Sequence, residues 1–178
     1  AAAGDLNGDG QVDLVFAGDS LFSSSHWLYL NAGQSFSPAA TGNLLPSTGK
    51  ATLFDIDGDG DLDVLHSWGA MRLLRNDGTA GLSDISSTHL PAGVNAFGRA
   101  AYSDIDNDGD LDVLLPQGKV LANNGAGVFT DVTATHFVGS GFSIGLEMVV
   151  ADFDNDGDED FVIMTGLHRN NGAGVFTI

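Results

Sequence analysis

The stretch Asp104-Ile-Asp-Asn-Asp-Gly-Asp-Leu-Asp112 decides how this 178-residue chain is interpreted. It recurs with small changes at residues 5–13, 55–63 and 152–160. All four loops place an oxygen-bearing side chain at positions 1, 3, 5 and 9 and glycine at position 6. Carboxylates crowded in this way repel one another, whereas a hard cation such as Ca²⁺ takes six to eight oxygen ligands in flexible geometry. The glycine permits the sharp turn that lets positions 1, 3 and 5 converge.

The EF-hand loop begins in the same way, but it needs an acidic ligand at position 12 and a following helix. Here position 12 is Phe16, His66, Leu115 or Ile163, and the residues after each loop are short apolar runs typical of strands. We therefore expect four calcium loops set in β-hairpins, the alternative being acidic surface turns without a metal. Position 7 varies and would offer its backbone carbonyl; its residues are Gln11, Asp61, Asp110 and Asp158.

The loops begin 50, 49 and 48 residues apart, and a period near fifty with several strands per unit indicates a propeller or array. An apolar strand is expected before each loop (1–3, 51–54, 99–102 and 148–151), and another directly after it. A third strand is expected at 27–30, 71–74, 119–122 and 166–168. After an Asn-x-Gly turn, a fourth strand is expected at 34–36, 81–82, 127–130 and 174–177.

These strands predict an all-β fold, a β-propeller of four-stranded antiparallel blades with a calcium-binding hairpin loop in each. We expect a single domain, 1–178, with blades at approximately 1–40, 41–88, 89–136 and 137–178. No helix is expected, because no window repeats apolar residues with helical spacing. The first loop has only four residues ahead of it, so we expect the chain to be cut from something longer or to lack its true ends.

The amino-acid composition argues against several classes of function. The formal net charge is −18, and 19 of the 24 acidic residues lie inside the four loops. Most of the acidic residues are therefore candidate metal ligands. Only six Lys and Arg are present, and they are scattered, which argues against a nucleic-acid partner. The absence of cysteine excludes disulfides and thiolate metal sites. No apolar run reaches the 18 residues of a membrane span, and no signal peptide is visible.

With loops and strands placed, the chain resembles the FG-GAP repeat family in its FG-GAP-like/VCBS branch, and more distantly the blades of the integrin α-subunit propeller. The stretches 123–133 and 101–114 carry the resemblance, which covers essentially the whole chain. It implies a propeller that binds four Ca²⁺, one in the hairpin between the first two strands of each blade. The implied side-chain ligands are Asp5, Asn7, Asp9, Asp13, Asp55, Asp57, Asp59, Asp63, Asp104, Asp106, Asp108, Asp112, Asp152, Asp154, Asp156 and Asp160.

This sequence departs from the family pattern in three respects. The name-giving Phe-Gly occurs once, at Phe97-Gly98, without a following Gly-Ala-Pro. Family propellers usually have seven blades, and this chain supplies four. Glu159 stands where the other loops have Val12, Leu62 and Leu111, which puts the packing of the fourth blade in question.

An enzyme is not expected, because the sequence has no cysteine, no His pair at metal spacing and no phosphate loop. The family implies an extracellular or cell-surface binding or adhesion module for a carbohydrate or protein ligand. Trp27, Trp68 and Tyr29 could stack on sugars or simply pack within blades. The alternatives are a structural subunit of an extracellular assembly, in which copies pair with one another, and a non-catalytic part of a secreted enzyme.

Two smaller features have open interpretations. His89 and His136 occupy equivalent positions in the linkers 86–91 and 133–138, either as spacer residues with a local hydrogen bond or as contacts to a shared ligand. The long hairpin 17–25 of the first repeat carries Leu21 and Phe22 at its tip, either as a contact surface or packed within the loop.

Overall fold

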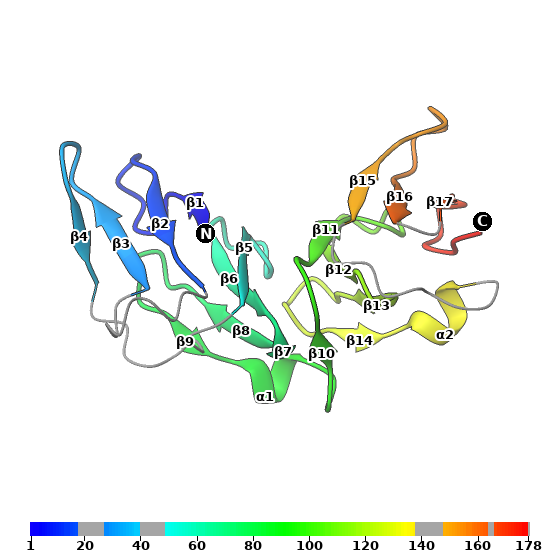
Figure 1. Cartoon of the computed structure of the whole chain (residues 1–178), viewed down its shortest axis with the longest axis horizontal. Helices are drawn as coiled ribbons and strands as arrows, with labels where there is room; N and C mark the ends of the chain where they lie inside the picture. The colour runs from blue at the N-terminus through cyan, green and yellow to red at the C-terminus, as the bar shows by residue number, and fades with distance from the viewer. Residues whose placement is uncertain (18–26, 40–48, 138–147, 164–165, 178) are drawn as a thin grey trace.

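The computed structural model describes residues 1–17, 27–39, 49–137, 148–163 and 166–177. Four antiparallel sheets follow one another along its long axis, from the N-terminal sheet on one side to the C-terminal sheet on the other (Figure 1). The first contains β1 (Ala2–Gly4), β2 (Asp13–Val15), β3 (Leu28–Asn31) and β4 (Phe36–Pro38). The second contains β5 (Lys50–Phe54), β6 (Asp63–Ser67), β8 (Arg72–Arg75) and β9 (Ser83–Asp84). The third contains β11 (Ala101–Ser103), β12 (Asp112–Leu115), β13 (Lys119–Ala122) and β14 (Thr130–Asp131), and the fourth β15 (Val149–Ala151), β16 (Asp160–Ile163) and β17 (Gly166–His168).

The expected order of hairpin-connected strands is confirmed, but the fourth strands lie further along the chain than expected. In the third repeat the strand was expected at 127–130, whereas β14 begins at Thr130. The side chain of Asn124 accepts hydrogen bonds from the backbone N–H groups of Ala126 and Val128, and Gly127 has a φ of 71°, so the turn extends further. In the fourth sheet an isolated antiparallel bridge between Arg169 and Thr177 stands in place of a fourth strand.

The expectation of no helix is wrong, because each of two linkers contains a single helical turn. These are α1 (Ser86–His89) and α2 (Thr133–His136). Asp84 accepts a hydrogen bond from the backbone N–H of Ser86 at 3.0 Å, and Asp131 binds Thr133 in the same way at 3.1 Å. Four residues are too few to show helical periodicity. Within the described ranges, no helix has the length and apolar character of a membrane span.

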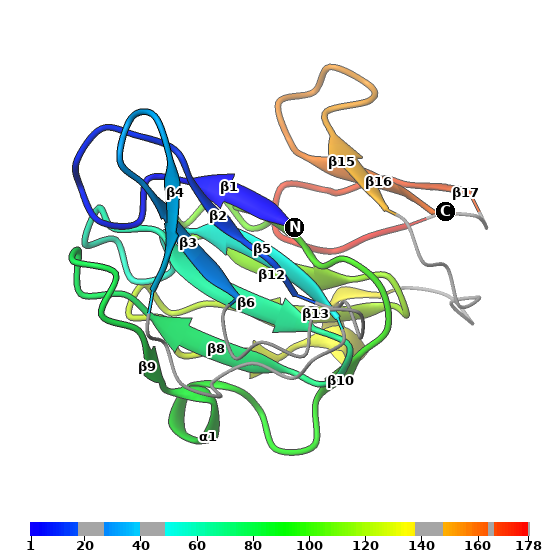
Figure 2. The same cartoon turned by 60° about the vertical axis from the view of Figure 1, so that its left-hand side comes forward.

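A further two-stranded sheet was not expected from the sequence. The strand β7 (Gly69–Ala70) pairs antiparallel with β10 (Asn95–Ala96) in a two-stranded sheet. It joins the connection between β6 and β8 to the segment that leads into the third repeat, and Figure 2 shows β10 beside the second sheet. The tip of the long first-repeat hairpin, with Leu21 and Phe22, lies outside the described residues, as does the end of the second linker at residue 138.

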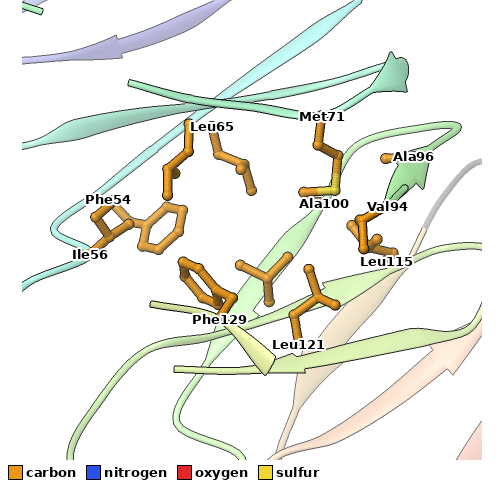
Figure 3. Close-up of a cluster of buried hydrophobic side chains, with 12 residues drawn as sticks. Phe54, Ile56, Leu65, Met71, Val94, Ala96, Ala100, Leu115, Leu121 and Phe129 are labelled. Carbon is orange, nitrogen blue, oxygen red and sulfur yellow. The ribbon is translucent and has the colours of Figure 1, made fainter. Parts of the chain in front are cut away.

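The hydrophobic core lies between sheets, because neighbouring sheets pack face to face. One cluster lies between the first and second sheets, one between the second and third, and one between the third and fourth. The middle cluster brings Phe54 and Leu65 of the second sheet against Leu121 and Phe129 of the third (Figure 3). The strands β6 and β12 are buried along their whole length, since sheets lie on both of their faces. The first sheet is covered on one face only, and Val12 and Phe16 remain 54% and 48% exposed.

Three buried asparagines link consecutive sheets, and we call them the linking asparagines. Each begins the turn after the third strand of its repeat, and its Nδ2 donates to the backbone carbonyl of loop position 2 in the preceding repeat. The pairs are Asn76 with Leu6 at 2.8 Å, Asn123 with Ile56 at 2.8 Å, and Asn170 with Ile105 at 2.7 Å. A buried carbonyl left without a donor is costly, so these bonds fix both the spacing and the register of neighbouring sheets.

The first strands of the repeats converge on a common cavity of about 490 Å³. It is lined by residues of β1, β5 and β11 together with Met148, next to the start of β15. This arrangement around a shared space is the one expected of propeller blades. No strand of the first sheet pairs with the fourth sheet within the described part of the chain, so a closed ring is not observed. The proposed blade boundaries stay a prediction.

We expect Asn123→Ala to lower the free energy of unfolding by about 1–3 kcal/mol, because the carbonyl of Ile56 loses its buried donor. Asn31→Ala is the matched control: Asn31 occupies the same position in the first repeat, but its Nδ2 donates to the carbonyl of Val12 in its own loop and, among the described residues, to no other repeat. The control should cost less than about 1 kcal/mol. Urea unfolding measures both, and equal losses would contradict a linking role for Asn123.

Candidate metal centres

The first aspartate of each loop organises the turn that follows it. In the second loop, Oδ1 of Asp55 accepts the N–H of Gly58 at 2.8 Å and Oδ2 accepts the N–H of Gly60 at 2.9 Å. The other three loops repeat this pattern with N–H groups from positions 4 or 5 and 6. The position-6 glycine is left-handed, with a φ of 93° at Gly60, which confirms why glycine stands there. In the first loop, the bond from Gly10 holds the pKa of Asp5 below its usual range.

Position 5 closes the second half of the turn. Its Oδ1 accepts the backbone N–H of position 7 at 2.8–3.0 Å in all four loops. Position 4 also adopts a left-handed backbone, and it is glycine in the first two loops and Asn107 or Asn155 in the others. Asparagine tolerates this conformation better than most residues. The four loops therefore share one backbone path despite their sequence differences.

Position 9 has a larger role than the sequence indicated. Asp63 is buried; its Oδ2 accepts the N–H of Ile56 at 3.0 Å, and its Oδ1 accepts the N–H of Asn76 at 2.7 Å. Asp13, Asp112 and Asp160 repeat both bonds. Burial raises the pKa of Asp63 and of Asp112 to about 6. Each oxygen keeps a second lone pair, so the same carboxylate can also face a cation.

Position 3 provides the observation that tests whether the loops fit a metal. Oδ1 of Asp57 and Oδ1 of Asp106 are buried and accept no hydrogen bond in the described structure. Burial, followed by the charge of Asp108, raises the pKa of Asp106. A buried carboxylate oxygen without a partner is costly, and a divalent cation would satisfy it. The donor set is entirely oxygen, as a hard cation requires.

Three loops bring carboxylates close enough to hold a metal ion. In each, one oxygen from each of three aspartates lies within 4.8 Å of the other two. The groups are Asp55, Asp57 and Asp63; Asp104, Asp106 and Asp108; and Asp152, Asp154 and Asp160. In the first loop, position 3 is Asn7, whose Nδ2 donates to Oδ2 of Asp9 at 3.2 Å. That loop would offer an amide oxygen in place of one carboxylate.

The position-7 side chains do not join these groups. A Cβ on Gly78, in the Asn-x-Gly turn, would lie 2.5 Å from Oδ2 of Asp61, so this side chain rests on the turn. Gln11, Asp110 and Asp158 lie against Gly33, Gly125 and Gly172 in the same way. This agrees with a carbonyl contribution from position 7, which stays a prediction. It also explains the turn glycines, where any side chain would meet the position-7 group.

Arginines flank two of the loops. Nε of Arg169 lies 3.2 Å from Oδ2 of Asp154, and Nη1 of Arg75 lies 4.0 Å from Oδ2 of Asp57. Both arginines immediately precede a linking asparagine, where the other two repeats have Leu30 and Ala122. The guanidinium offsets part of the charge at position 3 and would compete with a cation there.

Glu159 finds a partner in the preceding sheet. Position 8 of a loop packs against the residue that precedes position 1 in the repeat before it. Leu62 lies against Gly4, where an added Cβ would meet its Cδ1 at 2.5 Å. At the equivalent place in the third repeat, the hydroxyl of buried Ser103 donates to the Glu159 carboxylate. The departure at Glu159 is therefore matched by a polar residue across the interface.

The linker histidines make local hydrogen bonds, as expected if they are spacer residues. Nδ1 of His89 lies 2.7 Å from Oγ1 of Thr88, and Nδ1 of His136 lies 2.9 Å from Oγ1 of Thr135. Their backbone carbonyls accept the N–H groups of Phe129 and Phe176 in the next repeat, at 2.8 and 2.7 Å. No sequence pattern predicted this second link between sheets.

The three candidate sugar-stacking residues differ in exposure. Trp27 is buried, at 8% exposure, and Tyr29 is half-buried and packs edge-on against Phe16 at 5.6 Å. Trp68 is 43% exposed and lies beside Phe97, which is 48% exposed. Only Trp68 of these three therefore presents a large part of its ring to solvent.

The fold and the loops define a repeat protein of antiparallel sheets with an acidic hairpin loop in each repeat. The chain belongs to the FG-GAP-like repeat family, which it matches over residues 5–66, 55–115 and 117–163. Among solved structures, it is similar to a lectin from Agrocybe aegerita that specifically recognises non-reducing terminal N-acetylglucosamine. The TM-score is 0.66 at 22% identity, over 99% of this chain and 50% of the lectin chain, so this chain spans about half that length. No curated protein matches the chain.

We expect Arg169→Ala to tighten cation binding in the fourth loop by about 1.4- to fivefold, because an exposed ion pair of this kind is worth about 0.2–1 kcal/mol. The matched control is Arg72→Ala, since Arg72 pairs with Asp84 outside the loops. The backbone amide of Gly157 reports on the fourth loop alone in an NMR titration. Weaker binding in the Arg169 variant would show that the arginine supports the site.

Proposed function

We propose that the chain is a calcium-stabilised, non-enzymatic carbohydrate-binding module of an extracellular or cell-surface protein, and that its sheets are blades of a β-propeller. The single observation that carries the calcium assignment is the pair of buried carboxylate oxygens without partners, on Asp57 and Asp106. The similarity to a lectin supports a saccharide ligand over a protein ligand.

Four ions, one for each loop, account best for the charge. Four Ca²⁺ would bring the formal net charge from −18 to about −10. Calcium suits these loops better than Mg²⁺, which demands near-ideal octahedral geometry and dehydrates reluctantly. Modules that bind calcium at about 10⁻⁴–10⁻³ M work outside the cell, and this is the reason for proposing an extracellular location.

A binding role is favoured over catalysis by the nature of the polar groups. The carboxylates of the loops are engaged by backbone N–H groups of their own turns, and a calcium ion would hold them further. The sequence contains no cysteine that could act as a nucleophile. A closed shell of oxygen ligands leaves no open position for metal-assisted hydrolysis.

Calcium titration should give four sites per chain, and removal of calcium should lower the melting temperature steeply. Binding to the folded form alone stabilises by about 1.4 kcal/mol per site at tenfold excess over Kd, or about 5–6 kcal/mol for four independent sites. Asp108→Ala should remove one site. Asp131→Ala, which deletes a carboxylate outside the loops, should remove none.

Isothermal calorimetry counts the sites, and thermal unfolding with and without chelator at equal ionic strength measures the stabilisation. Fewer than three sites, or a shift of only a degree or two, would contradict the calcium proposal.

The module should bind saccharides as a monomer. Glycan-array screening in calcium, followed by calorimetry with the best ligand, tests the carbohydrate assignment. The competing function, a subunit of an extracellular assembly, is favoured by the exposure of Val12 and Phe16 on the first sheet and of Phe153 on the fourth. Sedimentation velocity on the same samples separates the two: long oligomers without glycan binding would favour the assembly.

A further inference from the structure

The outward face of the two-stranded β7–β10 sheet carries four exposed residues, Trp68, Ala70, Asn95 and Phe97, which we call the aromatic platform. Ladder pairs join Gly69 with Ala96 and Ala70 with Asn95. Continuing this register places Trp68 opposite Phe97. Side chains alternate across a strand, so Ala96 points into the core between the second and third sheets while its neighbours point out.

The platform is held by hydrogen bonds from two repeats. Oγ of Ser67 donates to the carbonyl of Gly98 at 2.7 Å. From the third repeat, Oε1 of Gln117 accepts the N–H of Phe97 at 3.3 Å, and Nε2 of Gln117 donates to the carbonyl of Asn95. Ala96, which is buried in the core, anchors the other face of this two-stranded sheet. The two aromatic side chains therefore stand on a backbone that needs little ordering when a ligand binds.

The rings form a corner rather than a flat stack. The centroids of Trp68 and Phe97 lie 6.4 Å apart and their planes meet at 78°. Rings in the core of this protein are covered by neighbouring sheets, whereas these two are 43% and 48% exposed. An exposed corner of this kind offers one ring face to a flat apolar surface and a second ring at its edge.

The polar groups of the platform are uncharged. Asn95 is exposed, its Nδ2 donates to the carbonyl of Gly93, and its amide oxygen is an acceptor group. The indole N–H of Trp68 is a hydrogen-bond donor on a side chain that is 43% exposed. A pyranose has an apolar C–H face and a rim of hydroxyls, so it matches a ring flanked by neutral donors and acceptors.

Size and position exclude other ligand classes. A stable protein partner needs about 800 Å² on each side, far more than four side chains supply. The metal loop of the same repeat ends at Asp63, the first residue of β6, whereas Trp68 follows its last residue, Ser67. The two sites thus lie at opposite ends of one strand, about 13–17 Å apart, so the loop carboxylates do not face the platform.

We infer that the aromatic platform is the saccharide-binding site of this chain, with Trp68 stacking on a pyranose ring, Phe97 bounding it, and Asn95 accepting a hydrogen bond from a hydroxyl. This inference rests on the proposed carbohydrate-binding function and adds its location. The rings Phe16 and Tyr29 form another edge-on pair, but they lie on the face of the first sheet that corresponds to an inter-sheet surface in the later repeats.

The test uses the 178-residue chain in calcium, with N-acetylglucosamine, its β1–4-linked trimer and cellotriose as probes. Trp68→Ala and Phe97→Ala should each weaken binding of the best probe at least about tenfold, and Asn95→Ala about threefold. Phe16→Ala is the matched control, because Phe16 is as exposed as Phe97 and also packs edge-on against a ring; it should change affinity less than twofold. Thermal unfolding of every variant checks that it is folded. If Trp68→Ala does not fold, Phe97→Ala provides the test.

Fluorescence gives a second measurement, because the chain has only two tryptophans. Acrylamide, a neutral quencher, should reach Trp68 but not buried Trp27, and the bound probe should protect Trp68. Trp68→Phe should abolish the protected signal. If the unaltered chain binds a probe but Trp68→Ala and Phe97→Ala bind equally well, the platform is not the site and the proposed function stands. If the unaltered chain binds no saccharide, the proposed function and this inference both fail.

Discussion

One buried carboxylate per repeat holds the rest of the structure in place. Asp63 receives the N–H of Ile56 at the start of its loop and the N–H of Asn76 after the third strand. It therefore ties the acidic loop, the first hairpin and the turn of the second hairpin to a single residue. Removing that residue from water is unfavourable for its charge, as its raised pKa reflects, and the two backbone donors offset only part of the cost.

The backbone of Ile56 connects the acidic loop to the next sheet. Ile56 gives its N–H to Asp63 of its own repeat and its carbonyl to Asn123 of the following repeat. Between these two bonds lies the side chain of Ile56, which packs in the core between the second and third sheets. Loop, core and inter-sheet bond thus meet at one residue, so the order of an acidic loop and the packing of its neighbours depend on each other. A cation that orders the loop would act on the interface as well.

Much of this could be predicted from the sequence, because the deciding features are local. Spacing and loop composition predicted the all-β repeat, the strand order and the turn at Gly60. The one-turn helices were not predicted because four residues carry no period, and the β7–β10 pairing was not predicted because two-residue strands 24 residues apart leave no pattern. Asn76 was recognised only as a turn residue, since its bond to Leu6 crosses 70 positions of sequence. The pairing of Glu159 with Ser103 likewise needs both sheets in place.

The inter-sheet contact is asymmetric in a way that bears on how such chains change in length. Every repeat carries a donor, its turn asparagine, on one face and an acceptor, its position-2 carbonyl, on the other. Asn31 and Val12 belong to the donor face of the first sheet, and Phe153 carries the acceptor on the fourth. A repeat inserted or deleted as a unit of about fifty residues would bring both halves of the contact with it. Duplication or deletion of a repeat could therefore lengthen or shorten the array without creating a new kind of interface. Only paired residues such as Ser103 and Glu159 would restrict a repeat to one particular neighbour.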